Sequence, residues 1–265
     1  MSKAPSPRVA LVTGANGAIG QAIAAGIAAT RGFEVVMVCR DKTRGARSLA
    51  AVQRLSAGSE VRLEIVDLSR KTSIQALAER WEGPLHVLVN NAAQAPAQRT
   101  ETPEGIEAQW AVNVLSYVWM MEAFAGTLKA TAPARIVNVA SYWAGGMDLS
   151  DPEFKQRPYD NDQAYRQSKQ ADRMLSSAYA ERMKDNGVTV NACHPGDVSS
   201  KLSMDLGFGG YDTPEQGAAT PVMLATEPIG GKVTGRYFEH RRESVCRFSA
   251  DREGVEALYA LCRKY

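Results

Sequence analysis

Short apolar runs that alternate with long helix-like stretches limit most strongly what this chain can fold into. Six β-branched runs are bounded by turn signals: 9–12, 35–38, 61–66, 85–89, 136–139 and 188–193. Between them, five stretches are long enough to be crossover helices: 19–30, 43–56, 71–81, 103–129 and 163–186. Strands that are apolar on both faces suit a parallel sheet with helices on each side. The alternation therefore predicts one doubly wound α/β domain over residues 1–265.

The bulk properties exclude several classes of protein. With 265 residues, 45% of them hydrophobic, and a net charge of +2, the chain can bury a core and carries no global field that favours nucleic acid. The start, Met1 to Arg8, is short and polar, and no apolar run approaches the roughly 18 residues of a membrane span. Four cysteines without CxxC spacing or a histidine cluster predict a reducing compartment and no metal. We expect a cytoplasmic protein with no nucleic-acid or membrane partner.

The first predicted strand runs directly into a glycine-rich turn that opens the first helix. Glycine at positions 14, 17 and 20 lets the backbone turn tightly and approach a pyrophosphate, which then lies on the helix N-terminus. Such triplets also occur in turns without a ligand, but this one lies between a strand and a helix. We expect a dinucleotide site of the Rossmann fold, with contacts from Gly14, Asn16, Gly17, Ala18, Ile19 and Gly20.

The residue that ends the second strand predicts which dinucleotide binds. A carboxylate there would accept hydrogen bonds from the ribose hydroxyls of NAD, whereas this strand ends in Arg40, with Lys42 and Arg44 just beyond. A guanidinium pairs bidentately with the 2′-phosphate of NADP. Asp41 is the alternative, because it would serve NAD if it turned inward. The basic residues favour NADP(H), and they disfavour a methyltransferase, which usually has an acidic residue at this place.

Tyr165 and Lys169 lie one turn apart on the same face of a predicted helix. A tyrosine phenol has a pKa near ~10 and is a poor proton donor or acceptor at neutral pH. A neighbouring ammonium favours the phenolate and lowers that pKa, and the lysine would also hold the nicotinamide ribose. The spacing is common in helices, so its meaning depends on the other polar residues at the predicted strand ends.

Several polar residues follow the other strands or interrupt apolar stretches. Ser141 follows the fifth strand, where a hydroxyl can polarise a substrate oxygen, and the Asn113 amide needs a water or backbone partner in its apolar stretch. Asp67 ends the third strand and would either accept from the adenine amino group or cap a helix, with Ser69 as competitor. The other residues expected to border the coenzyme are Leu68, Asn91, Ala92, Pro195, Gly196, Val198 and Ser200.

Two irregular regions, at about 145–162 and 196–212, follow strands at their carboxyl ends. Open α/β sheets bind ligands there, so we expect these regions to be substrate loops. Trp143 and Met147, which follow Ser141, either line an apolar substrate pocket or pack in the core or the loop. On the glycine-bearing loop, four large side chains are expected to close over the substrate: Met204, Leu206, Phe208 and Tyr211.

Taken in order, these motifs resemble the short-chain dehydrogenase/reductase family over nearly the whole chain. The likeness rests on the glycine-rich turn, Asn90-Asn91-Ala92, Asn113, Ser141, Tyr165 with Lys169, and Pro195-Gly196. It implies a catalytic tetrad of Asn113, Ser141, Tyr165 and Lys169. Tyr165 would then be the general acid in reduction, and Lys169 would relay protons through a water held by Asn113. His194, before Pro195, is interpreted as structural.

Within that family the chain looks most like the retinol dehydrogenase and protochlorophyllide reductase branch. Val38-Cys39-Arg40-Asp41, Asp67-Leu68-Ser69 and Thr234 to Phe238 carry this likeness. The chain departs from the family pattern at Ala18, Ala93 and Ala140, and it shows no N-terminal membrane anchor.

The leading hypothesis is an NADP(H)-dependent carbonyl reductase or alcohol dehydrogenase that acts on a mid-sized, partly apolar small molecule. A dinucleotide-binding regulator without turnover is the alternative, and epimerase, dehydratase or C=C reductase chemistry is a third. Four large residues at helical spacing favour either a homodimer interface or core packing: Trp110, Tyr117, Met121 and Phe124.

Overall fold

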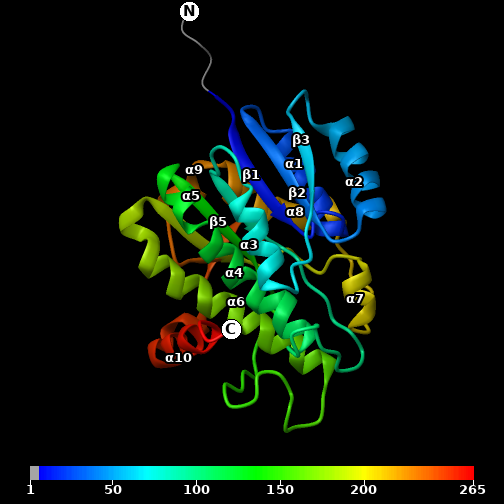
Figure 1. The fold of residues 1–265 in the computed structure, drawn as a ribbon, viewed down its shortest axis with the longest axis vertical. Coiled ribbons are helices and arrows are strands. Elements are labelled where there is room, and N and C mark those ends of the chain that lie inside the picture. The colour runs from blue at the N-terminus through cyan, green and yellow to red at the C-terminus, as the bar shows by residue number, and fades with distance from the viewer. Residues whose placement is uncertain (1–5) are drawn as a thin grey trace, which may run out of the picture.

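An eight-stranded sheet forms the centre of the molecule in the computed structural model, which describes residues 6–265 (Figure 1). The strand order is β3-β2-β1-β4-β5-β6-β7-β8; β1 to β7 are parallel and β8 is antiparallel to β7. The strands are β1 (Arg8–Thr13), β2 (Phe33–Cys39), β3 (Val61–Ile65), β4 (Val87–Asn90), β5 (Ala134–Val139), β6 (Val188–Cys193), β7 (Tyr237–Glu239) and β8 (Arg242–Ser244). The predicted doubly wound α/β fold is confirmed, with one antiparallel edge strand added.

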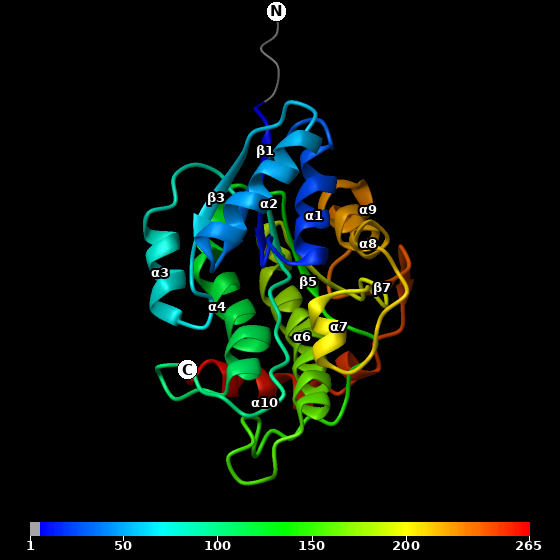
Figure 2. The same cartoon turned by 90° about the vertical axis from the view of Figure 1, so that its right-hand side faces the viewer.

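Helices cover both faces of the sheet (Figures 1 and 2). Alternate strand residues point to opposite faces, so each face presents apolar side chains that the helices bury. Val9 and Leu11 pack with one set of helices, whereas Ala10 and Val12 pack with the other. The first set is α3 (Lys71–Glu79), η1 (Trp110–Leu115), α4 (Ser116–Ala123), α5 (Ala125–Ala130), α6 (Asn161–Met183) and α10 (Arg252–Cys262). The second set is α1 (Ala18–Ala28), α2 (Lys42–Leu55), α8 (Pro214–Thr226) and α9 (Pro228–Lys232). The remaining short helices are η2 (Lys184–Asn186), α7 (Lys201–Asp205) and η3 (Arg247–Ala250).

The prediction of a single helix over residues 103–129 is wrong. Residues 103–107 form a turn with a left-handed Gly105; the backbone is helical from Ala108, and the π-helical turn η1 begins at Trp110. The buried Glu107 carboxylate accepts hydrogen bonds from the backbone N–H groups of Gln109 (2.8 Å) and Trp110 (2.6 Å), and thereby starts the helix there. The helical part is interrupted again at Phe124.

The four residues at helical spacing lie in the core. Trp110, Tyr117, Met121 and Phe124 are buried within this one chain, so core packing is the correct alternative for them. Of the two predicted loops, 145–162 is mostly irregular, whereas 196–212 contains the short helix α7.

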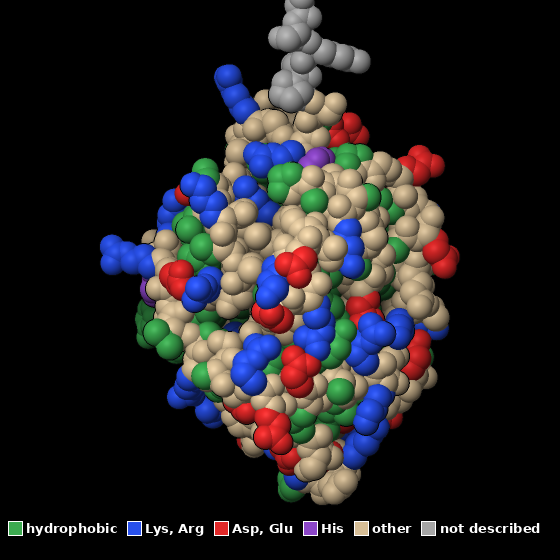
Figure 3. Space-filling model, turned by 90° about the vertical axis from the view of Figure 1, so that its left-hand side faces the viewer, with side chains coloured by type: hydrophobic (Ala, Val, Ile, Leu, Met, Phe, Trp, Pro, Cys, Tyr) green, Lys and Arg blue, Asp and Glu red, His purple; other side chains and the backbone are tan. Residues whose placement is uncertain are grey.

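The surface shown in Figure 3 intermixes basic and acidic side chains. Among residues 6–265, no helix combines the length and the apolar character that crossing a bilayer requires.

Candidate active site

The carboxyl ends of β1, β4, β5 and β6 lie at one edge of the sheet, and helix α6 packs against β5 and β6. A cleft opens there between the strand ends and α7. Seven residues predicted from the sequence line it: Ile19, Ser141, Tyr165, Pro195, Gly196, Val198 and Ser200. Trp143, Leu206 and Phe208, which were expected at the substrate, line it as well, and the other lining residues are His194, Asp197, Leu202 and Ser203. The topology therefore brings together residues that are up to 189 positions apart in the sequence (208 − 19).

The glycine-rich turn is shaped by close backbone approaches. Gly14 has φ +63°, and a Cβ on it would lie 2.8 Å from the Ala92 Cα. A Cβ on Gly20 would overlap the Gly14 carbonyl oxygen and approach the Asn91 amide. That amide nitrogen donates to the Thr13 carbonyl at 2.9 Å. Two of the three glycines are therefore required by the fold itself, because no larger residue fits there.

The N-terminus of α1 has the properties of an anion site. The helix begins after Gly17, which has no side chain to cap it, whereas Asp41 and Asp160 cap α2 and α6. The first N–H groups of a helix point outward along its axis and carry partial positive charge. Ala18 and Ile19 supply such groups and stay half-exposed. This arrangement fits the pyrophosphate of a dinucleotide.

The basic end of β2 lies beside this turn. Arg40 is exposed, while the Asp41 carboxylate accepts from the Arg44 backbone N–H at 2.8 Å and so serves as the N-cap of α2. Asp67 accepts from the Ser69 backbone and hydroxyl (3.1 and 2.7 Å), and neither residue caps α3, which begins after Arg70.

The other coenzyme candidates differ in exposure. The Leu68 side chain packs in the core, and Ala92 is buried beneath Gly14. Asn16 and Asn91 are half-buried at the same turn.

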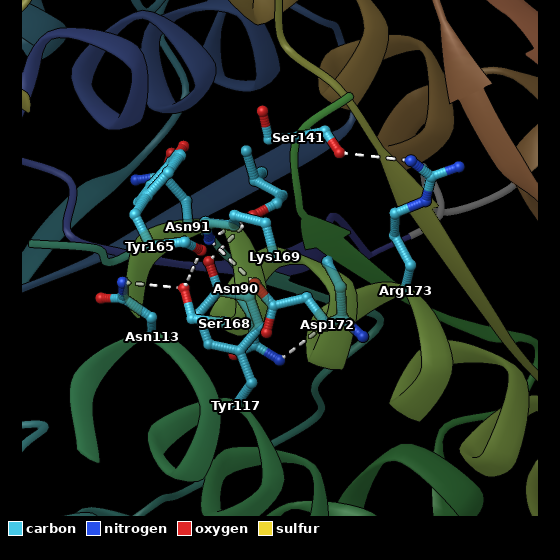
Figure 4. Close-up of polar contacts among 12 residues, drawn as sticks. Asn90, Asn91, Asn113, Tyr117, Ser141, Tyr165, Ser168, Lys169, Asp172 and Arg173 are labelled. Atoms are coloured by element: carbon cyan, nitrogen blue, oxygen red, sulfur yellow. Dashed lines mark hydrogen bonds and ion pairs between the residues drawn. The ribbon is translucent and has the colours of Figure 1, made fainter. Parts of the chain in front are cut away.

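Tyr165 and Ser141 face each other across the cleft (Figure 4). The lowered pKa expected for the Tyr165 phenol is wrong for this structure: burial raises the pKa above its usual value, although the Lys169 ammonium and the Ser141 hydroxyl both act to lower it. The Ser141 Oγ accepts from the Trp143 backbone N–H at 3.0 Å, which fixes the hydroxyl oxygen. The phenol is therefore protonated at neutral pH and can donate a hydrogen bond into the cleft.

Lys169 lies under Tyr165 in a dry environment. Its Nζ donates to the Val139 carbonyl at 3.1 Å and to the Asp172 carboxylate at 2.8 Å. Nζ lies 5.9 Å from the centre of the Tyr165 ring. Burial is the largest single effect and opposes the charge on Lys169, but Asp172 together with Tyr117 and Tyr165 acts against it, and the pKa of the ammonium is raised.

Asn113 lies in the π-helical turn η1 and is fully buried. Its Oδ1 accepts from the Gln94 backbone N–H at 2.9 Å, and its Nδ2 donates to the Gln94 carbonyl and to the Ser168 hydroxyl (3.0 and 3.1 Å). A water or a backbone group was expected as the partner of this amide, and the structure shows the backbone of Gln94 in that place. The hydrogen bond from Asn113 to Ser168 connects η1 to α6 directly below Tyr165 (Figure 4).

Comparison with known proteins places this geometry in a family. The family model described as short chain dehydrogenase matches residues 8–207. This chain belongs to that family. The resemblance stated from the sequence is confirmed, and the short-chain dehydrogenase is by family an oxidoreductase enzyme that acts on a small molecule.

Relatives of this short-chain dehydrogenase are similar over most of its length. It is 37% identical to a probable oxidoreductase of Streptomyces antibioticus, over 96% of this chain and 92% of that one. It is 32% identical to mouse retinol dehydrogenase 13, over 96% and 82% of the two chains, which supports the retinol dehydrogenase-like branch. Among solved structures, a Pseudomonas aeruginosa RhlG/NADP active-site complex has a TM-score of 0.70 at 27% identity, covering 88% and 94% of the two chains.

Three residues of this short-chain dehydrogenase site were missed by sequence reasoning. The Thr13 hydroxyl accepts from the Asn91 backbone N–H at 2.8 Å and joins the ends of β1 and β4. Asp172 pairs with Lys169, and the buried Arg173 lies 3.6 Å over the Tyr237 ring and donates to the Ser141 carbonyl at 3.4 Å. The helical spacing places Asp172 on the face of Lys169, which was the available signal. His194, interpreted as structural, is buried and stacks edge-on against Tyr142.

Proposed function

We propose that this enzyme transfers a hydride between NADP(H) and a carbonyl or alcohol of a mid-sized, partly apolar substrate. The observation that carries the proposal is the convergence of Ser141 and Tyr165 on one cleft, with Lys169 buried beneath the phenol.

The coenzyme preference is supported by the end of β2. Asp41 is engaged as the cap of α2, so its carboxylate is turned away from a ribose, whereas Arg40 is exposed and available to a 2′-phosphate. The residues expected to hold the dinucleotide are those of the glycine-rich turn, with Asn91 and Pro195 to Ser200 beside the nicotinamide end. The RhlG structure with NADP is a related precedent.

The roles of the three residues follow from their surroundings. When bound, NADPH would supply the hydride. Tyr165 would donate its proton to the substrate oxygen, since burial keeps the phenol protonated. Ser141 would hold that oxygen by a hydrogen bond, and Lys169 would stabilise the phenolate left behind. With Asn113 these residues make up the proposed tetrad.

The cleft supports an apolar substrate. Trp143 and Phe208 pack 5.0 Å apart at 35°, and Leu202 and Leu206 of the α7 segment extend the apolar lining. The polar end carries Ser141 and Tyr165. A substrate with one carbonyl on an apolar body would match this distribution.

A screen of ketones, aldehydes and quinones with NADPH and NADH, followed by nicotinamide absorbance, tests the proposal. Tyr165→Phe should lower kcat about 10²–10⁴-fold while NADPH binding is retained, because only the proton donor is lost. Tyr142→Phe is the matched control, since that exposed phenol makes only a 3.4 Å contact with Asp197. If no substrate is turned over, the regulator without turnover becomes the better function. If Tyr165→Phe turns over substrate as fast as Tyr142→Phe, Tyr165 is not the proton donor proposed here.

Two alternatives keep the fold and change the chemistry. Epimerase and dehydratase reactions, as well as C=C reduction, would not place deuterium from labelled NADPH on a carbonyl carbon. Stereospecific transfer to that carbon supports the proposal, and its absence in an active enzyme refutes it.

We also infer a cytoplasmic location. Cys39, Cys193 and Cys262 are buried free thiols and Cys246 is a half-buried one, as a reducing compartment would leave them. A homodimer stays a proposal that sedimentation can test.

A further inference from the structure

A buried carboxylate that the proposed mechanism does not use lies one turn beyond Lys169. Asp172 Oδ2 accepts from Lys169 Nζ at 2.8 Å, and the two side chains are 0% and 2% exposed. Its second oxygen, Oδ1, has no hydrogen-bond partner among residues 6–265. An ion pair this dry is not screened by solvent, so each partner strongly changes the charge that the other presents to its surroundings.

The position of the ammonium is determined by two acceptors on the side away from Tyr165. Nζ is held between the Asp172 carboxylate and the Val139 carbonyl, which also accepts from the Tyr117 hydroxyl at 3.2 Å. The phenol of Tyr165 thus faces a cation whose field is partly cancelled by an anion directly behind it (Figure 4).

Within the part of the chain that the structure describes, no second negatively charged side chain contacts the Lys169 ammonium. Burial raises the pKa of the surrounding groups and keeps them neutral: Tyr117 on α4, Tyr165 on α6, Cys193 on β6 and Cys262 on α10. Arg173 turns toward Tyr237, and Asp197 acts on Tyr165 from the loop after β6. Burial raises the pKa of the Asp172 carboxyl to about 7, and the Lys169 ammonium acts to lower it; paired with that ammonium, Asp172 is the anion that acts on Lys169.

We propose that Asp172 is a positioning residue that holds the Lys169 ammonium against Val139 and keeps the Tyr165 phenol protonated. The inference rests on the proposed function and deepens it, because a protonated phenol is the form that carbonyl reduction requires. Removing the negative charge favours loss of a proton from the Tyr165–Lys169 pair, so the phenol ionises at lower pH.

The titration of Tyr165 in the protein alone tests this role. In wild type and in Asp172→Asn, the tyrosinate absorbance of the chain is measured against the same chain carrying Tyr165→Phe, without coenzyme or substrate. We expect the apparent pKa of Tyr165 to fall by about one unit or more in Asp172→Asn. Asp185→Asn, at an exposed position in η2, should leave it unchanged. An unchanged or higher value in Asp172→Asn overturns the proposal.

This readout does not depend on turnover, so it separates failure of the inference from failure of the proposed function. In the active enzyme, the pH at which alcohol oxidation reaches half its maximal rate should move down with the phenol. A purely structural Asp172 would change the amount of folded enzyme but not this pH.

A double-mutant cycle keeps the proposal testable if Asp172→Asn is too unstable to titrate. Asp172→Asn and Lys169→Met each leave one charged partner buried and unpaired, whereas the double variant leaves neither. We expect the double variant to unfold at a higher denaturant concentration than either single variant. If the losses of unfolding free energy in the two single variants simply add in the double variant, Asp172 and Lys169 do not interact as proposed here.

Discussion

At the scale of single residues, two neighbours at the end of β2 have opposite consequences for coenzyme choice. The Asp41 carboxylate caps α2 by accepting from the Arg44 N–H, and the hydrogen bond lowers the pKa of Asp41. Using that carboxylate to bind a ribose would uncap the helix. Arg40 does not cap a helix and remains exposed beside the glycine-rich turn. Local capping therefore favours the coenzyme that an arginine can bind.

Arg40→Gln is expected to raise the KM for NADPH about tenfold and to change the KM for NADH little, since only NADPH offers a phosphate to the guanidinium. Steady-state kinetics with both coenzymes measure this. Arg47→Gln, at another exposed arginine of α2, should leave both values unchanged. Equal losses with NADPH and NADH would contradict a 2′-phosphate contact.

At the scale of elements, the β1–α1 connection depends on how closely its backbone segments approach. Gly20 lies in the first turn of α1, directly against the Gly14 carbonyl and the Asn91 amide. The same contacts align the ends of β1 and β4 through Thr13. A methyl group at Gly20 would have to push this turn apart.

Gly20→Ala should therefore destabilise the protein by about 1–3 kcal/mol through overpacking, and should weaken coenzyme binding. Denaturant unfolding and a coenzyme fluorescence titration check the two effects. Gly126→Ala in α5 is the control, because its Cβ would meet nothing within 4 Å. Stability at or above wild type for Gly20→Ala would show that the turn can relax.

At the scale of the whole molecule, Arg135 ties the central strand β5 to the helices that cover one face. Its guanidinium donates to the carbonyls of Leu224, Ala225 and Glu227 at 3.1, 3.0 and 2.7 Å, where α8 ends and α9 begins. The Leu224 and Ala225 carbonyls belong to the last turn of α8, where no N–H of a following turn is available, whereas the Glu227 carbonyl also accepts from the Gly230 N–H at 3.3 Å. The contact spans about 90 residues of sequence and fixes α8 against α1 and the sheet.

Arg135→Met should cost about 2–4 kcal/mol of unfolding free energy, because it leaves those carbonyls without a charged donor. The residual enzyme should keep its KM for NADPH, since Arg135 lies away from the cleft-lining residues. Arg54→Met, at an exposed position of α2, is expected to stay within about 0.5 kcal/mol of wild type. A loss of unfolding free energy no larger than that of Arg54→Met would refute the proposal that Arg135 holds α8 and α9 on β5.

Much of the fold could be predicted because β1, β2, β4, β5 and β6 are largely apolar and stand out as buried strands. β7 and β8 could not, since each has three residues and β8 is largely exposed. The helix expected from 103 begins instead at Ala108, directly after Glu107, because the Glu107 carboxylate accepts from the N–H groups of Gln109 and Trp110.

The sequence alone determined which residues stand at the strand ends, since a parallel sheet brings those ends to one edge whatever the details of packing. Thr13, Asp172 and Arg173 became visible only in the tertiary structure. Whether a polar side chain is exposed or shut in with a charged partner depends on how α6 rotates against β5 and α10. That rotation is set by long-range packing, which no local spacing of residues encodes.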